Sequence, residues 1–152
     1  MCRWFDSSYH HLFGADLMKS NSSARFKRVL LIDDNEIDNF INERIITSSG
    51  FSEVCTVQTS TDSAIDYLKS LSGQVENLPE IIFLDLNMPG KDGFAFLEIF
   101  NGLDESIRIT SKVVVLSSSI SPDDINRASS NAYVIRYLNK PLSEKYLEAI
   151  EV

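Results

Sequence analysis

The sequence is poor in the features that mark secreted, membrane and zinc-binding proteins. Only two of its 152 residues are cysteines, Cys2 and Cys55, and they have neither metal-ligand spacing nor the paired thiols of a disulfide framework. No apolar run approaches the roughly 18 residues of a membrane-spanning helix. The first residues lack the basic start and apolar stretch of a secretory signal. We therefore expect a protein of the reducing cytoplasm, without a membrane partner.

Positive charge is also scarce, since 14 Lys and Arg residues face 22 Asp and Glu residues, for a net charge of −8. Binding to a phosphate backbone needs a clustered positive field. The one dense basic group, from Arg25 to Arg28, stands at the start of a predicted strand, where solvated charges are ordinary. The sequence thus argues against nucleic acid as a direct partner. Its apolar (43%) and charged (24%) fractions are those of a globular domain with a sizeable core.

Composition divides the chain in two. Residues 1–24 begin with an aromatic-rich stretch that includes Trp4 and the pair His10-His11, and they end in a serine-rich segment typical of a linker. We predict that this N-terminal extension is flexible, although its apolar stretch would also suit a docking segment. The two histidines have no third metal ligand nearby. Residues 25–152 are predicted to form the folded domain.

In that domain, apolar runs alternate with amphipathic segments. Short unbroken apolar runs are typical of strands buried on both faces, and we predict strands at Val29–Ile32, Val54–Gln58, Ile81–Leu84, Val113–Leu116 and Val134–Leu138. Helices are predicted from an N-cap at Asn35 to a stop at Gly50, at Thr61–Leu71, at Phe94–Leu103, after Ser121, and from Ser143 to the C-terminus, with loops at Ser72–Leu78 and Asp104–Ser111. Five alternations predict an α/β fold with a doubly wound, five-stranded parallel sheet in three layers.

Polar side chains follow the central predicted strands at equivalent places. Asp33 and Asp34 follow the first strand, Asp85 the third, Ser117 the fourth and Lys140 the fifth. Each of them alone has an ordinary structural explanation, such as a helix start or a solvated surface lysine. In a parallel sheet, however, all carboxyl ends share one edge, which is where such sheets bind ligands. Their recurrence predicts one functional site.

The chemistry of these groups is mutually consistent. Three close carboxylates raise one another's pKa unless a cation compensates, and oxygen ligands of this kind suit Mg²⁺. A cation and a lysine beside a carboxylate can neutralise a phosphoryl group that arrives on it. Aspartate is an established nucleophile towards phosphorus.

On these residues the chain resembles the receiver domains of two-component response regulators. The matching motifs are Asp33-Asp34, Asp85 within Leu84–Gly90, Ser117, and Lys140-Pro141. The resemblance extends from about Arg25 to the C-terminus and implies a flavodoxin-like fold of the CheY kind. It further implies that Asp85 accepts a phosphoryl group from a histidine kinase or a histidine phosphotransfer protein. Such a domain is a phosphoacceptor in a phosphorelay that catalyses only its own phosphorylation and dephosphorylation.

The same resemblance implies a role for each site residue. Asp34, Asp85 and the main-chain carbonyl of Asn87 would bind Mg²⁺, assisted by Asp33. Lys140 would pair with Asp85 and then with the phosphoryl group, and its bond to Pro141 would be cis. Ser117 would hydrogen-bond the phosphoryl oxygens.

Tyr137 matches the aromatic residue through which such domains switch. When the hydroxyl of Ser117 moves, this ring would turn inward and change a surface read by a downstream protein, or used in a phosphorylation-dependent dimer. From the residue alone, an ordinary strand aromatic is the simpler interpretation. The final helix is short for one wall of such a surface.

Three alternatives remain at this stage. A haloacid-dehalogenase-type phosphatase also uses an aspartate after a strand, but it needs a second acid two residues later, where this chain has Asn87. A receiver-like interaction module would have no need of so repulsive an acidic set. Nucleotide-binding relatives would carry Gly-x-Gly-x-x-Gly after the first strand, and it is absent. The chain is either a single-domain regulator or a receiver from a longer protein.

Overall fold

In the computed structural model, residues 24–152 are described, and they form a three-layer α/β structure. The aromatic residues and the histidine pair of the predicted extension lie outside the described residues. The predicted boundary near residue 24 lies at their edge. Five parallel strands form one sheet in the order β2-β1-β3-β4-β5. The strands are β1 (Phe26–Ile32), β2 (Ser52–Gln58), β3 (Ile81–Leu84), β4 (Lys112–Ser117) and β5 (Val134–Asn139). The predicted fold class is confirmed.

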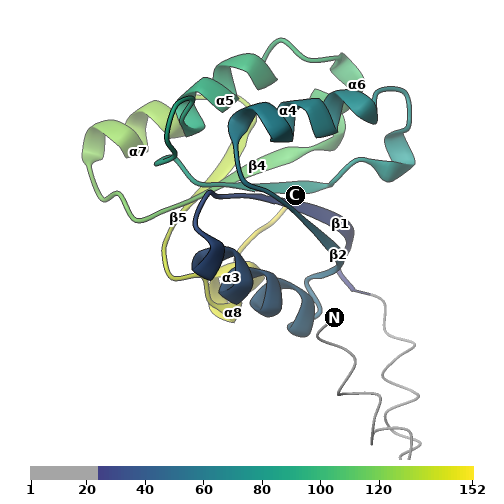
Figure 1. The fold of residues 1–152 in the computed structure, drawn as a ribbon. Coiled ribbons are helices and arrows are strands. Elements are labelled where there is room, and N and C mark those ends of the chain that lie inside the picture. The colour runs from purple at the N-terminus through teal and green to yellow at the C-terminus, as the bar shows by residue number, and fades with distance from the viewer. Residues whose placement is uncertain (1–23) are drawn as a thin grey trace, which may run out of the picture.

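Helices cover both faces of the sheet (Figure 1). One face carries α3 (Glu36–Ser48) and α8 (Glu144–Glu148). The other carries α4 (Thr61–Ser70), α5 (Gly93–Phe100), α6 (Glu105–Thr110) and α7 (Pro122–Ser129), and a short 3-10 helix, η1 (Val75–Asn77), precedes β3. No described helix combines the length and apolar character needed to cross a bilayer.

The central strands supply the core because their side chains alternate between the two faces. On β1, Leu30 and Ile32 pack with the cluster beneath α4 and α5, which includes Phe96 and Phe100. Val29 and Leu31 point to the opposite cluster, beneath α3 and α8, which includes Phe83. With both faces covered, the sheet exposes ligand-binding groups only where its strands end.

The predicted helix signals are largely confirmed. Asn35 caps α3, Ser121 caps α7 with Pro122 at its first position, and Ser143 caps α8. Gly50 ends the α3 region with φ +81°, a conformation that favours glycine.

The prediction that Asp104–Ser111 is a loop was wrong, because α6 occupies it. Ile107 and Ile109 alternate as residues of a strand might, but Ile107 is buried in the core while Ile109 is exposed, since they lie on different sides of a helical turn. The predicted loop Ser72–Leu78 likewise contains η1. The last helix ends at Glu148, short of the chain end.

The apolar spacing in α3 identified the helix but not its buried face. Ile37 and Phe40 are 70% and 61% exposed, whereas Asn39, Asn42 and Ile46 are buried. Asn39 is held there by donating its amide to the backbone carbonyl of Asp33, at 2.8 Å.

Candidate functional site

Three aspartates lie together at the carboxyl edge of the sheet. Asp33 and Asp34 follow β1 and Asp85 follows β3, and these strands are hydrogen-bonded neighbours. One carboxylate oxygen from each residue lies within 4.8 Å of the other two. Asp33 and Asp85 are buried, at 1% and 5% exposure, while Asp34 is open to solvent. The group is therefore rooted in the core and accessible from one side.

Lys140 supplies the positive charge of this group. Its Nζ lies 2.7 Å from Oδ2 of Asp33 and 3.7 Å from Oδ1 of Asp85. Its backbone N–H donates to the carbonyl of Ser117 at 2.9 Å, and its bond to Pro141 is cis. The ammonium thus bonds directly to Asp33 and stands just beyond hydrogen-bonding distance from Asp85.

The two central groups have shifted pKa values. Burial, reinforced by the charge of Asp33, raises the pKa of Asp85 from 3.8 to about 6, against the opposing effects of Lys140 and of the backbone N–H of Asn87. For Lys140, burial alone would lower the pKa, but hydrogen bonds to Asp33 and Asp38 outweigh it and raise the pKa to about 12. Lys140 is therefore charged at neutral pH, whereas Asp85 gives up its proton near pH 6, well above the usual range of a carboxyl group.

Asp38 is a further member of this site, one that the sequence pattern did not reveal. Its Oδ2 accepts a hydrogen bond from Nζ of Lys140 at 2.8 Å. Asp38 stands in the first turn of α3, four positions after Asp34. Because acids are also common in the first turn of any helix, the spacing alone did not reveal this contact.

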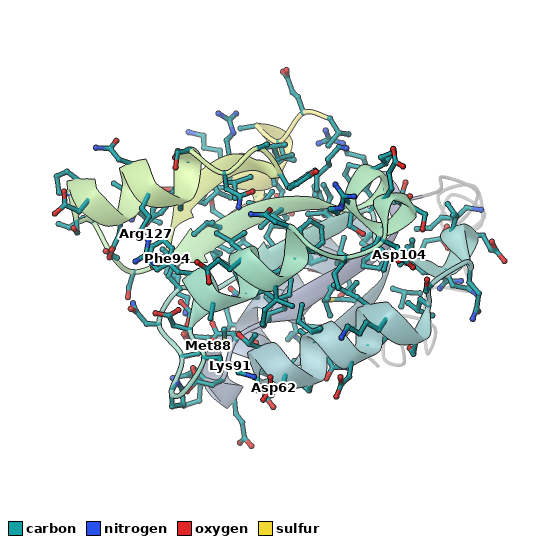
Figure 2. All side chains as sticks on the ribbon, turned by 90° about the horizontal axis from the view of Figure 1, so that it is seen from above. Asp62, Met88, Lys91, Phe94, Asp104 and Arg127 are labelled. Carbon is teal, nitrogen blue, oxygen red and sulfur yellow. The ribbon has the colours of Figure 1, made fainter. Side chains whose placement is uncertain are left out.

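The loop after Asp85 is held from several sides. Gly93 approaches its start so closely that a Cβ atom there would lie 2.6 Å from the carbonyl oxygen of Asp85. Thr61 donates its hydroxyl to the carbonyls of Lys91 and Asp92, at 2.9 and 3.2 Å. Figure 2 shows Lys91 beside Asp62, with which it forms an ion pair of 2.7 Å. Asn87 is thereby presented next to Asp85 on a restrained loop.

Hydroxyl and amide groups link β4 and β5 on the other side of the site. Ser117 is fully buried, and its Oγ accepts from the backbone N–H of Ser119 at 3.1 Å. The carbonyl of Ser119 in turn accepts from the hydroxyl of Tyr137 at 2.9 Å and from the amide of Asn139 at 3.1 Å. Ser117 and Tyr137 are thus connected through Ser119, which the sequence analysis had not singled out.

The three aspartates fit a hard divalent cation. They offer only oxygen donors, and one ammonium compensates only part of their combined negative charge. Mg²⁺ needs few protein ligands because it keeps several waters. A divalent cation could therefore bind between Asp33, Asp34 and Asp85.

The chain is similar to known proteins. Residues 29–150 match the response regulator receiver domain family. The chain is 36% identical over 116 residues to the probable methanogenesis regulatory protein FilR2 of Methanothrix harundinacea, covering 76% of this chain and 72% of that protein. In other relatives the match covers a smaller share of the relative's own length. It covers 19% of the sensory/regulatory protein RpfC of Xanthomonas campestris and 43% of the transcriptional regulatory protein PrrA of Mycobacterium bovis.

Solved structures agree with the sequence match. A two-component response regulator from Cytophaga hutchinsonii superimposes with a TM-score of 0.74 at 36% identity, covering 80% of this chain and 91% of that one. The Mn(2+)-bound form of response regulator Rcp1 gives 0.59 at 29% identity, covering 80% and 86%. With its five-stranded parallel sheet and the acidic group at its edge, the chain belongs to the response regulator receiver domain family.

Proposed function

We propose that the chain is a Mg²⁺-dependent phosphoacceptor that receives its phosphoryl group on Asp85. The observation that carries this proposal is the placement of Asp85, a buried carboxylate with two further carboxylates and one ammonium around it. No ordinary structural role calls for three carboxylates to be held together, because their repulsion costs stability. A phosphorylation site gives that arrangement a use.

In the proposed step, a carboxylate oxygen of Asp85 attacks the phosphorus of a phosphohistidine on the donor protein. The electron pair of that oxygen forms the O–P bond, while the pair of the P–N bond stays on the donor's ring nitrogen. The product is an aspartyl phosphate, with no net gain or loss of phosphate. Attack requires the ionised carboxylate, and with a pKa of about 6 Asp85 is mostly ionised at pH 7 in spite of the upward shift.

Asp34, Asp85 and the carbonyl of Asn87 would hold the Mg²⁺, with Asp33 assisting. When bound, the ion would neutralise charge on the transferring oxygens. The oxygen-only donor set supports this assignment. A related structure, the Mn(2+)-bound form of response regulator Rcp1, also supports it, because Mn²⁺ and Mg²⁺ share a preference for oxygen ligands.

Lys140 would then contact the phosphoryl oxygens, and Ser117 would donate its hydroxyl to them. The Oγ of Ser117 can donate to a phosphoryl oxygen while it still accepts from the backbone N–H of Ser119. A shift of Ser117 towards the phosphoryl group would then draw Ser119 with it, and the carbonyl of Ser119 binds Tyr137. A change at the phosphoryl group would therefore reach the surface around Tyr137. We propose that a downstream protein reads this surface.

The donor is proposed to be a histidine kinase or a phosphotransfer protein, in keeping with the family. We place the protein in the cytoplasm and regard it as a signalling domain rather than an enzyme with an external substrate.

The decisive experiment is intact-mass spectrometry after incubation with acetyl phosphate, with and without Mg²⁺. We expect one phosphoryl adduct on the wild type, dependent on Mg²⁺, and none on Asp85→Asn. The variant keeps the shape of the side chain, so circular dichroism should show an unchanged fold. An equal adduct on Asp85→Asn would refute Asp85 as the acceptor. The complete absence of an adduct, together with no binding of beryllofluoride, would favour an interaction module that is never phosphorylated.

A further inference from the structure

Lys140 is held by a carboxylate that the proposed reaction does not use. Asp38 lies on α3, outside the three-aspartate group, yet its Oδ2 is 2.8 Å from Nζ of Lys140. That distance nearly equals the 2.7 Å to Asp33 and is much shorter than the 3.7 Å to Asp85. In this state, two of the three N–H donors of the ammonium are directed to Asp33 and Asp38 rather than to the phosphoacceptor.

The position of Asp38 is fixed by a closed ring of contacts. Oδ1 of Asp33 accepts from the backbone N–H of Asn35 at 2.9 Å. Oδ1 of Asn35 accepts from the backbone N–H of Asp38 at 2.9 Å. Lys140 closes the ring by donating to Asp38 and to Oδ2 of Asp33. The end of β1, the N-terminus of α3 and the end of β5 are therefore joined through one ammonium group.

We propose that Asp38 is a positioning residue that competes with the phosphoryl group for Lys140. This inference rests on the proposed function. A phosphoryl group on Asp85 would draw Nζ across a gap that now measures 3.7 Å to Oδ1. Because the ammonium is held in place by Asp33 and Asp38, that movement weakens at least one of these bonds. Asp38 thereby stabilises the unphosphorylated state and lowers the affinity for the phosphoryl group.

Of the two bonds that hold Lys140, the one to Asp38 breaks more easily than the one to Asp33. The side chain of Asp33 is 2% exposed, so losing its cation would leave a buried charge without compensation. The side chain of Asp38 is 36% exposed, and water can replace the ammonium there. An exposed ion pair is worth less and breaks at lower cost. The ring thus has one strong bond to Lys140 and one bond that can be exchanged.

The test measures the affinity for beryllofluoride, a phosphoryl analogue, at saturating Mg²⁺. Binding is followed through backbone amide signals in ¹H–¹⁵N NMR, which also detects weak complexes. We expect Asp38→Ala to bind about fivefold more tightly than the wild type, the effect of losing one partly exposed ion pair. Glu36→Ala is the matched control, because it removes another carboxylate from the first turn of α3, and Glu36 forms no ion pair with Lys140. It should change the affinity by less than about twofold.

A second comparison separates competition for Lys140 from a general effect of charge. Asp38→Ala is introduced into Lys140→Ala, where no ammonium is left to compete for. In the Lys140→Ala background, we expect Asp38→Ala to give no gain in beryllofluoride affinity. A gain in affinity that persists in this background would overturn the proposal, since it would arise from the removal of a negative charge alone. Equal or weaker binding by the single variant Asp38→Ala would also overturn it.

These outcomes are distinct from a failure of the proposed function. If wild type binds beryllofluoride and Asp38→Ala binds it equally well, Asp85 remains the acceptor site and only the role of Asp38 is refuted. If the wild type binds no beryllofluoride and forms no acyl phosphate, the proposed function is refuted, and the role of Asp38 with it.

Discussion

The two sides of the site hold their residues by different means. On the side of β1 and α3, the contacts join charged groups: Lys140 with Asp33, Asp38 and, at longer range, Asp85. On the side of β4 and α7, Ser117, Ser119, Tyr137 and Asn139 form a chain of hydrogen bonds between neutral groups. Its contact with a charged group is at its margin, where the hydroxyl of Ser119 donates to Oδ2 of Asp124 at 2.7 Å. We refer to these as the charged side and the neutral side.

The difference indicates a division of labour. A phosphoryl group brings negative charge, and the charged side responds to it directly because Coulomb forces act over several ångströms in a poorly solvated site. The neutral side responds only when a hydrogen bond is exchanged, which requires contact. The affinity for a phosphoryl group should therefore depend on the charged side. The surface change that follows phosphorylation should depend on the neutral side.

The largest expected effect comes from moving Asp85 without altering any charge. In Gly93→Ala, the new Cβ would meet the backbone of Asp85 and Leu86 at 2.6 and 2.7 Å, where no flexible side chain can yield. We expect the free energy of unfolding to fall by about 3 kcal/mol, with a reduced rate of phosphorylation. Urea denaturation and the acetyl phosphate reaction measure both. Gly102→Ala is the control, since its Cβ would meet only one carbonyl oxygen, at 3.6 Å. Equal stability of the two variants would contradict the close approach.

The pH dependence of stability tests the charged side next. Because the pKa of Asp85 is about 6 in the folded protein and 3.8 ordinarily, the folded state binds this proton more tightly than the unfolded chain. The stabilisation from protonated Asp85 is present at low pH and is lost as the pH rises from about 4 to 6. Urea denaturation without divalent ions should show a smaller loss over this range for Asp85→Asn. Identical pH profiles would indicate an unshifted carboxyl group.

Lys140→Ala removes the cation of the charged side. It leaves the buried carboxylate of Asp33 without its 2.7 Å partner, so we expect the free energy of unfolding to fall by about 2 kcal/mol without Mg²⁺. Mg²⁺ should still bind, because the three aspartates remain, and should restore part of this loss. Thermal unfolding with and without Mg²⁺ measures the effect. Lys112→Ala, which removes a lysine that donates only to a backbone carbonyl, is the control. A loss no greater than that of the control would show that Lys140 is not the main compensating charge.

The smallest effect is expected on the neutral side. Tyr137→Phe deletes one neutral hydrogen bond to Ser119, whose carbonyl keeps its bond from Asn139. The free energy of unfolding should fall by about 1 kcal/mol or less. The affinity for beryllofluoride should stay within about twofold, while the NMR shifts that beryllofluoride induces around α7 and β5 should shrink. A large loss of beryllofluoride affinity would erase the proposed distinction between the two sides.

The sequence predicted the parallel sheet and the approach of Asp33, Asp34 and Asp85 because these follow from local rules. Apolar runs identified the strands, and parallel strands bring their carboxyl ends to one edge. The same rules failed in α6, which was predicted as a loop, and in α3, where Ile37 and Phe40 are exposed although they follow helical spacing. In both, packing against the rest of the domain selected the buried side chain.

The order of the elements, the caps of most helices and the identity of the acidic group follow from the amino-acid sequence alone. Which carboxylates Lys140 binds depends on how the chain folds. Its ammonium is 102 positions from Asp38 and 107 from Asp33 along the chain, and both bonds form because β5 and the N-terminus of α3 meet at the sheet edge. A long lysine side chain can reach several carboxylates, and their burial and distance determine which of them it binds.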